Sequence, residues 1–186
     1  MPVNIDRYKE IIAALKDKAT LVAVSKTKPV EDIQALYDLG QRDFGENYVQ
    51  ELLDKQQQLP ADIHWHFIGH LQSNKVKYIA TFVNLIHGVD SFNLLKEINK
   101  QAAKLNRIID CLLQLHIAKE ETKFGLDENE LKEVIEKSAS LTHVQIKGLM
   151  GMASFSDDTN LISKEFQQLK RIFNYLPQTS NIKHQT

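Results

Sequence analysis

The feature that most constrains the fold is a pattern that repeats six times, a short apolar run followed by a longer amphipathic stretch. The runs cover residues 21–24, 43–47, 63–69, 85–90, 110–117 and 144–153. They are too short for helices and apolar at nearly every position, which is typical of strands covered on both faces. In the segments between them, apolar residues recur about every 3.6 positions. The pattern therefore predicts a parallel sheet covered by helices.

Several of the predicted helices carry recognisable end signals. A first helix is expected over residues 5–16, before the first strand. Gly40 is a typical residue for a helix C-terminus. Ser91 suits an N-cap, and Asp127 with Glu130 has the spacing of a capping box. These signals place helix ends where the apolar pattern also changes.

A parallel sheet of this kind either stays open and doubly wound or closes into a barrel. No Gly-x-Gly-x-x-Gly segment follows the first run and no Walker-type phosphate loop occurs, which argues against the common nucleotide-binding open sheets. Polar residues at the ends of several different strands are typical of barrels. Here they are Lys26, Glu46, Asn47, Asp90 and His116. The sequence therefore favours an α/β fold of the (β/α)8 TIM barrel type.

The length of the chain fits six units of such a barrel. An eight-unit barrel takes about 250 residues, roughly 31 per unit, and this chain has 186. No linker, charge block or low-complexity segment divides it. We therefore expect residues 1–186 to form one barrel domain that is incomplete at its C-terminal end and lacks the last two strands.

Charge and cysteine content exclude some partners and sites. The net charge is -1, from 23 basic and 24 acidic residues, so nothing favours a nucleic-acid binder. No apolar window reaches the roughly 18 residues of a membrane span, and the charged N-terminus does not resemble a secretory signal. The single cysteine, Cys111, excludes an internal disulfide. We expect a cytoplasmic monomer with neither nucleic acid nor membrane as a partner.

Lys26 is the residue with the most specific chemistry. It follows an apolar strand and shares the face of Val22 and Val24 in a period-2 count. An inward-facing ammonium is costly to bury, and a lysine whose pKa such a site lowers forms a Schiff base with an aldehyde. Periodicity also leaves a second interpretation open, in which the strand has ended and Lys26 points to solvent.

Other candidate groups have simpler interpretations. His64 and His66 share a strand face, but no third ligand has a suitable spacing, so we interpret them as packing residues and expect no metal site. Cys111 is interpreted as a packed thiol. The charged loop 119–123 is interpreted as solvated, with the alternative that Lys123 reaches an anionic ligand over the barrel mouth. With no Ser/His/Asp triad or carboxylate pair visible, we assign no catalytic residue.

Three longer motifs resemble those of one known family. They are AVSKTKP at 23–29, FGENYVQE at 44–51 and WHFIGHLQSNK at 65–75, and GLMGMA at 148–153 also fits. In this order they resemble the YggS/PROSC family of pyridoxal phosphate homeostasis proteins. The resemblance runs from the first predicted helix to the last.

The resemblance implies a fold, a cofactor and a set of site residues. The fold is a (β/α)8 barrel like the N-terminal domain of alanine racemase, here a single domain that binds pyridoxal 5'-phosphate (PLP). Lys26 would carry PLP as an internal aldimine, and Val24 would line the pocket. Asn47 would reach toward the ring or its phenolic oxygen, Lys123 would lie near that oxygen, and Met152 would stack on the ring.

The resemblance also implies a function and one departure from the family. The implied function is intracellular homeostasis of PLP, other B6 vitamers and amino acids, without catalytic turnover. A PLP-dependent amino-acid racemase and a barrel enzyme without a cofactor remain alternatives. The family's Ser-x-Gly-Met-Ser and Arg-x-Gly segments, on the seventh and eighth strands, do not occur here. We therefore expect a weakened hold on the cofactor's phosphate.

Overall fold

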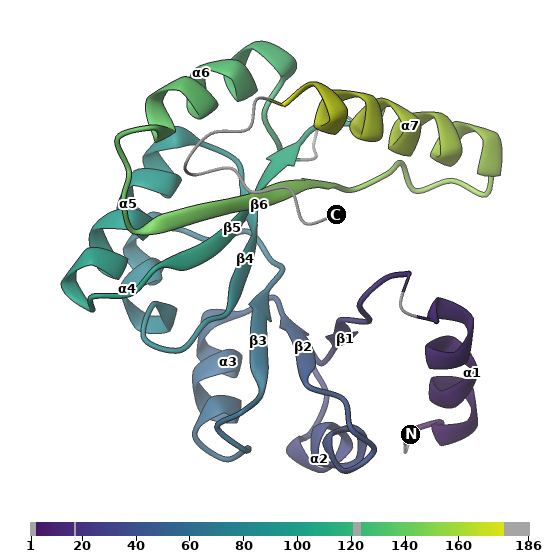
Figure 1. Ribbon diagram of the computed structural model, residues 1–186. Coiled ribbons are helices and arrows are strands. Elements are labelled where there is room, and N and C mark those ends of the chain that lie inside the picture. The colour runs from purple at the N-terminus through teal and green to yellow at the C-terminus, as the bar shows by residue number, and fades with distance from the viewer. Residues whose placement is uncertain (1–2, 17, 121–123, 177–186) are drawn as a thin grey trace.

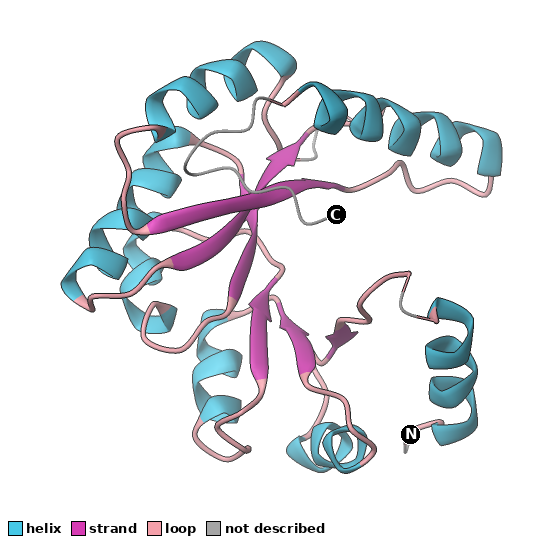
Figure 2. Cartoon of the chain, viewed as in Figure 1, coloured by secondary structure: helices cyan, strands magenta, loops and turns pink. Residues whose placement is uncertain are grey.

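The computed structural model describes residues 3–16, 18–120 and 124–176. Six strands alternate with helices along the chain (Figures 1 and 2). The strands are β1 Ala23–Val24, β2 Asp43–Glu46, β3 His64–Phe67, β4 Leu85–Val89, β5 Ile109–Leu115 and β6 Val144–Gly151. The helices are α1 Ile5–Leu15, α2 Val30–Asp38, α3 Val49–Gln56, η1 Ser73–Lys75 (a 3-10 turn), α4 Val76–Ile79, α5 Phe92–Lys104, α6 Glu128–Ser138 and α7 Thr159–Tyr175. None of these helices is long and apolar enough to cross a membrane.

All six strands pair in parallel in one sheet of order β1-β2-β3-β4-β5-β6. Strands that are neighbours in both sequence and space, with a helix between them, are the arrangement of a barrel. The sheet curves, and β1 and β6 lie at its two ends (Figure 1). Within the described ranges, each of these two strands has one neighbour. The predicted parallel α/β architecture is confirmed as part of a TIM barrel, in which the first and sixth strands are each paired on one side among the described residues.

The core lies on the side of the sheet that the helices cover. Phe67, Ile86, Cys111 and Ile146 form a row across four neighbouring strands, and each is at most 1% exposed. Burial raises the pKa of the Cys111 thiol. The interpretation of Cys111 as a packed thiol is therefore confirmed.

Most predicted helix ends are correct, because their signals act over three or four residues. Ser91 Oγ accepts a hydrogen bond from Leu94 N (3.3 Å). Asp127 and Glu130 form the predicted capping box at the start of α6. Gly40, with a φ of +99°, follows the end of α2.

The first strand is shorter than predicted. The apolar run predicts a strand over residues 21–24, but β1 contains only Ala23 and Val24. The carbonyl of Leu21 accepts a hydrogen bond from Gln41 Nε2 (2.8 Å), so its partner is a side chain and not a neighbouring strand.

Candidate functional site

Lys26 lies in a tight turn directly after β1. Ser25 N donates to Gly45 O (2.9 Å), so β1 stays attached to β2 up to the residue before Lys26. Lys28 N donates to Ser25 O (3.0 Å) and closes the turn. The Lys26 side chain is exposed, and its amine has no hydrogen-bond or ion-pair partner among the described residues. This agrees with the second interpretation of the periodicity, a lysine just beyond the end of its strand.

Val24 and Asn47 lie beside Lys26, at the carboxyl ends of β1 and β2. Val24 pairs with Gly45 and is 53% exposed. The Asn47 backbone packs so closely against Gly69 that a Cβ at Gly69 would collide with it. Asn47 Oδ1 is buried and has no hydrogen-bond partner in the described part of the chain. A buried acceptor without a donor costs about 1–3 kcal/mol, so a donor supplied from outside the chain would be stabilising here.

Met152, which was also predicted as a site residue, is not part of this group. Met152 follows β6 and is 42% exposed. Because β2 to β5 lie between β1 and β6, Met152 is at the opposite end of the sheet from Lys26. Lys123 lies outside the described residues. The structure thus brings together Lys26, Val24 and Asn47.

His70 forms a second set of contacts at the same edge of the sheet. Its Nδ1 lies 3.3 Å from Asp90 Oδ2, and its ring stacks on Phe124 with 4.3 Å between centroids. Gln114 Nε2 donates to the carbonyl of Phe124 (2.9 Å). These contacts tie together the ends of β3, β4 and β5. A pocket opens beside Asn47 and His70, lined also by Tyr48, Gln72, Lys75 and Tyr78.

Glu46 corrects the prediction that groups it with the polar strand ends. It is fully buried and pairs in register with Phe67, on the side of the sheet that the helices cover. Its Oε1 lies 2.6 Å from Lys55 Nζ on α3 and accepts from Ser25 Oγ at 2.7 Å. Side chains alternate between the two faces of a strand, so a polar residue at a strand end need not point into the barrel. The sequence signal for this contact was the period-2 spacing, which puts Glu46 on the same strand face as the buried Phe44.

A histidine pair occupies the opposite face of the sheet. His66 Nδ1 lies 2.8 Å from His87 Nε2, and His66 Nε2 lies 3.0 Å from Asp43 Oδ1. Burial lowers the pKa of His66, and burial together with His66 lowers the pKa of His87 to about 4. His66 is therefore a packing residue, as predicted, whereas His64 is exposed. The described residues contain no group of three or more side chains that could hold a metal ion.

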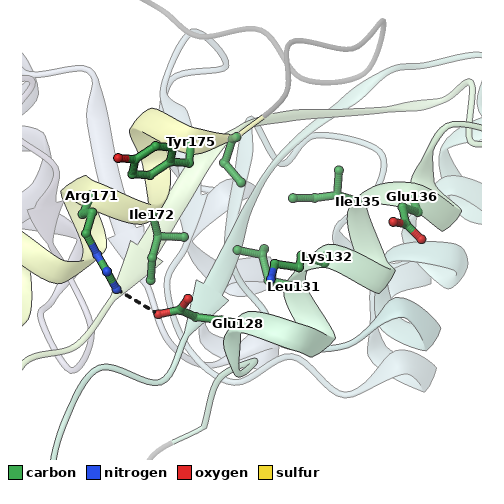
Figure 3. Close-up of a pocket in the computed structure, with 9 residues that line it drawn as sticks. Glu128, Leu131, Lys132, Ile135, Glu136, Arg171, Ile172 and Tyr175 are labelled. Atoms are coloured by element: carbon green, nitrogen blue, oxygen red, sulfur yellow. Dashed lines mark hydrogen bonds and ion pairs between the residues drawn. The ribbon is translucent and has the colours of Figure 1, made fainter.

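A separate groove lies between α6 and α7 (Figure 3). Leu131, Ile135 and Ile172 provide its apolar lining, and an ion pair between Arg171 and Glu128 (3.3 Å) crosses from one helix to the other. The groove is formed by the two helices, and its described lining includes none of Lys26, Val24, Asn47 and Met152. It is distinct from the site around Lys26.

Comparisons with known proteins identify the family. Residues 3–185 match the model of the alanine racemase N-terminal domain. The chain is 39% identical over 165 residues to the pyridoxal phosphate homeostasis protein of Aquifex aeolicus, covering 88% of this chain and 72% of the relative. It is also 39% identical over 140 residues to the protein of the same name from Escherichia coli K12, covering 73% and 60%.

Solved structures agree with this assignment. PipY of Synechococcus elongatus PCC7942, solved with PLP bound, is 34% identical with a TM-score of 0.79, covering 89% of this chain and 79% of PipY. The alanine racemase of Bartonella henselae, with covalently bound pyridoxal phosphate, is 20% identical with a TM-score of 0.67 over 84% of this chain and 45% of the racemase, which shows a shared fold. The chain therefore belongs to the family of pyridoxal phosphate homeostasis proteins, built on the fold of the alanine racemase N-terminal domain.

Proposed function

We propose that this chain binds pyridoxal 5'-phosphate at Lys26 and serves the homeostasis of PLP, other B6 vitamers and amino acids. One observation carries the proposal: an unpartnered exposed amine (Lys26), an exposed apolar side chain (Val24) and a buried acceptor without a donor (Asn47 Oδ1) lie together at the ends of β1 and β2. The names of its relatives and the PLP bound in PipY support it.

The side chains fit this cofactor. PLP supplies an aldehyde that bonds covalently to a lysine amine, and an aromatic ring. Lys26 offers the amine, Val24 offers an apolar contact for the ring, and Asn47 Oδ1 can accept a hydrogen bond from a donor on it. For Met152 and Lys123 the proposal depends on the resemblance alone, with Met152 stacking on the ring and Lys123 near the phenolic oxygen.

The same proposal includes the absence of racemase turnover. Racemisation needs acid–base groups placed around the reacting carbon, and relatives of this chain are named as homeostasis proteins. A turnover in the range of roughly 1–1000 per second on alanine or serine would favour the racemase alternative instead. We further propose that the chain acts as a monomer in the cytoplasm, a reducing compartment that suits its single buried cysteine, Cys111.

The test is to locate the covalent bond. The chain is incubated with PLP, reduced with borohydride and digested, and the labelled lysine is identified by mass spectrometry. We expect the label on Lys26, its loss in Lys26→Ala, and its retention in Lys28→Ala, in which a neighbouring exposed lysine is removed. A label found on Lys28 or Lys123 in place of Lys26 would contradict the assignment.

A further inference from the structure

A buried charged cluster lies directly behind the turn that carries Lys26. Lys55 on α3 has a side chain that is 6% exposed, and Glu46 at the end of β2 is fully buried. Burying an ion pair is costly unless its hydrogen bonds are well satisfied. Because burying the Lys55–Glu46 ion pair is costly, we expect this pair to have a role beyond packing in the core. We refer to four residues together as the anchor cluster: Ser25, Glu46, Glu51 and Lys55.

All three N–H groups of the Lys55 ammonium are used within the anchor cluster. They donate to Glu46 Oε1 (2.6 Å), to Glu51 Oε1 (2.7 Å) and to the backbone carbonyl of Ser25 (2.7 Å). The bond to Glu46 connects helix α3 to strand β2, and the bond to Glu51 lies within α3. The third bond reaches Ser25, the residue that follows β1. The ammonium therefore joins three elements at a single point, immediately before Lys26.

The turn is held on the other side of Lys26 as well. Thr27 N donates to Glu51 Oε1 at 2.6 Å, so the residues before and after Lys26 are both bonded to the anchor cluster. Thr27 has a φ of 60°, a left-handed conformation that is uncommon for a β-branched residue. Such a conformation persists where the surrounding contacts determine it, and the hydrogen bond that Glu51 accepts from Thr27 N is such a contact.

We propose that Glu51 and Lys55 are positioning residues, which hold the Ser25–Lys28 turn so that the Lys26 amine, and not that of Lys28, meets the cofactor's aldehyde. This inference rests on the proposed function. Lys26 and Lys28 are two residues apart in one turn and both are exposed. Chemistry alone does not distinguish two exposed amines, so the shape of the turn must select between them.

The test measures the ratio of labelled Lys26 to labelled Lys28 after PLP treatment and borohydride reduction of the 186-residue chain. Lys28 acts as an internal reference in the same peptide. In Glu51→Met the side chain keeps its length but loses the oxygen that accepts from Thr27 N and Lys55. We expect the ratio to fall about tenfold, because a hydrogen bond to a charged group is worth about that factor. Glu51→Ala should give the same fall, and provides a second variant if the first folds poorly.

Two further variants separate positioning from stability. Glu51→Gln keeps an acceptor oxygen for Thr27 N, and we expect it to restore most of the ratio. Glu133→Ala on α6 removes the exposed pair with Lys137 (2.8 Å), which has the same i,i+4 spacing as Glu51 and Lys55, and should leave the ratio unchanged. Circular dichroism confirms that each variant is folded at the labelling temperature. Lower stability alone would not change the ratio in folded protein.

The outcomes distinguish this inference from the function on which it rests. Equal labelling of Lys26 and Lys28 in the unmodified chain would overturn both. Selective labelling of Lys26 in the unmodified chain that persists unchanged in Glu51→Met and Glu51→Ala would leave the proposed function standing and overturn the positioning role. A fall in both variants that Glu51→Gln reverses would support it.

Discussion

At the scale of single residues, two lysines within a few ångströms of the same turn have opposite environments. Lys26 is exposed and its amine has no partner in the described part of the chain, whereas Lys55 is buried and all its donors are bonded. A primary amine with no partner is available for covalent chemistry. An ammonium bonded to Glu46 and Glu51 is a structural cation. Environment, and not residue type, therefore separates the two roles.

Because Lys55 and Glu46 are paired in the interior, the effect on stability of removing one charge should depend on whether the other is present. Lys55→Met leaves the buried Glu46 carboxylate without its counter-charge, and we expect the free energy of unfolding to fall by about 3–5 kcal/mol. Adding Glu46→Leu should recover part of this loss, because the double variant buries no unpaired charge. Urea unfolding of the single and double variants measures the difference. Strictly additive losses would show that the two charges are not coupled.

The His66–His87 pair predicts a loss of stability in mild acid. The pKa of His87 is about 4 in the folded chain and about 6.5 when unfolded, so the unfolded state binds more protons between these values. The free energy of unfolding therefore keeps its full value above pH 6.5 and falls by about 3 kcal/mol as the pH falls toward 4. Unfolding experiments over this pH range should show a smaller fall in the free energy of unfolding for His87→Gln. The control His64→Gln, which changes an exposed side chain, should show the same fall as the unmodified chain. A His87→Gln profile that overlays the unmodified one would contradict this.

At the scale of elements, helix starts are local structures whose stability depends on a few hydrogen bonds. Asp127 Oδ1 accepts from the backbone N–H groups of Asn129 (2.7 Å) and Glu130 (2.8 Å) at the start of α6. Asp127→Ala should lower the free energy of unfolding by about 1 kcal/mol. Asp157 is also exposed, but Asp158 and not Asp157 caps α7, so Asp157→Ala is the matched control. A thermal or urea melt in which both variants lose equal stability would exclude the capping contribution.

At the scale of the whole molecule, the two ends of the sheet differ from its middle. β3 and β4 each have two strand neighbours, whereas β1 and β6 each have one among the described strands. Backbone amides that have no strand partner exchange their hydrogens with solvent after smaller local openings of the structure. We expect amide hydrogen exchange to be slowest in β3 and β4 and faster in β1, and in those β6 amides that do not face β5. Uniform protection across all six strands would mean that β1 and β6 find further partners in solution.

Local patterns in the sequence determined the order of the elements. Apolar runs and 3.6-residue periodicity predict six strands and their helices, and Ser91 and Asp127 mark helix starts, because these signals act within one turn or one strand. The family motifs implied a site made of Lys26, Val24, Asn47, Lys123 and Met152. In the structure the first three lie at the ends of the adjacent strands β1 and β2, whereas Met152 follows β6 and Lys123 is outside the described residues.

Tertiary structure alone decided which faces meet. Glu46 and Lys55 are 9 residues apart, and His66 and His87 are 21 apart. Their spacing in the sequence does not predict that Glu46, on the helix-covered face of β2, contacts Lys55 on α3. It also does not predict that the imidazoles of His66 and His87 come into contact. Such contacts depend on strand register and on the packing of helices against the sheet, which are set by burial over the whole molecule. For this reason the sequence by itself pointed to the lysine, and only the folded chain revealed what holds it in place.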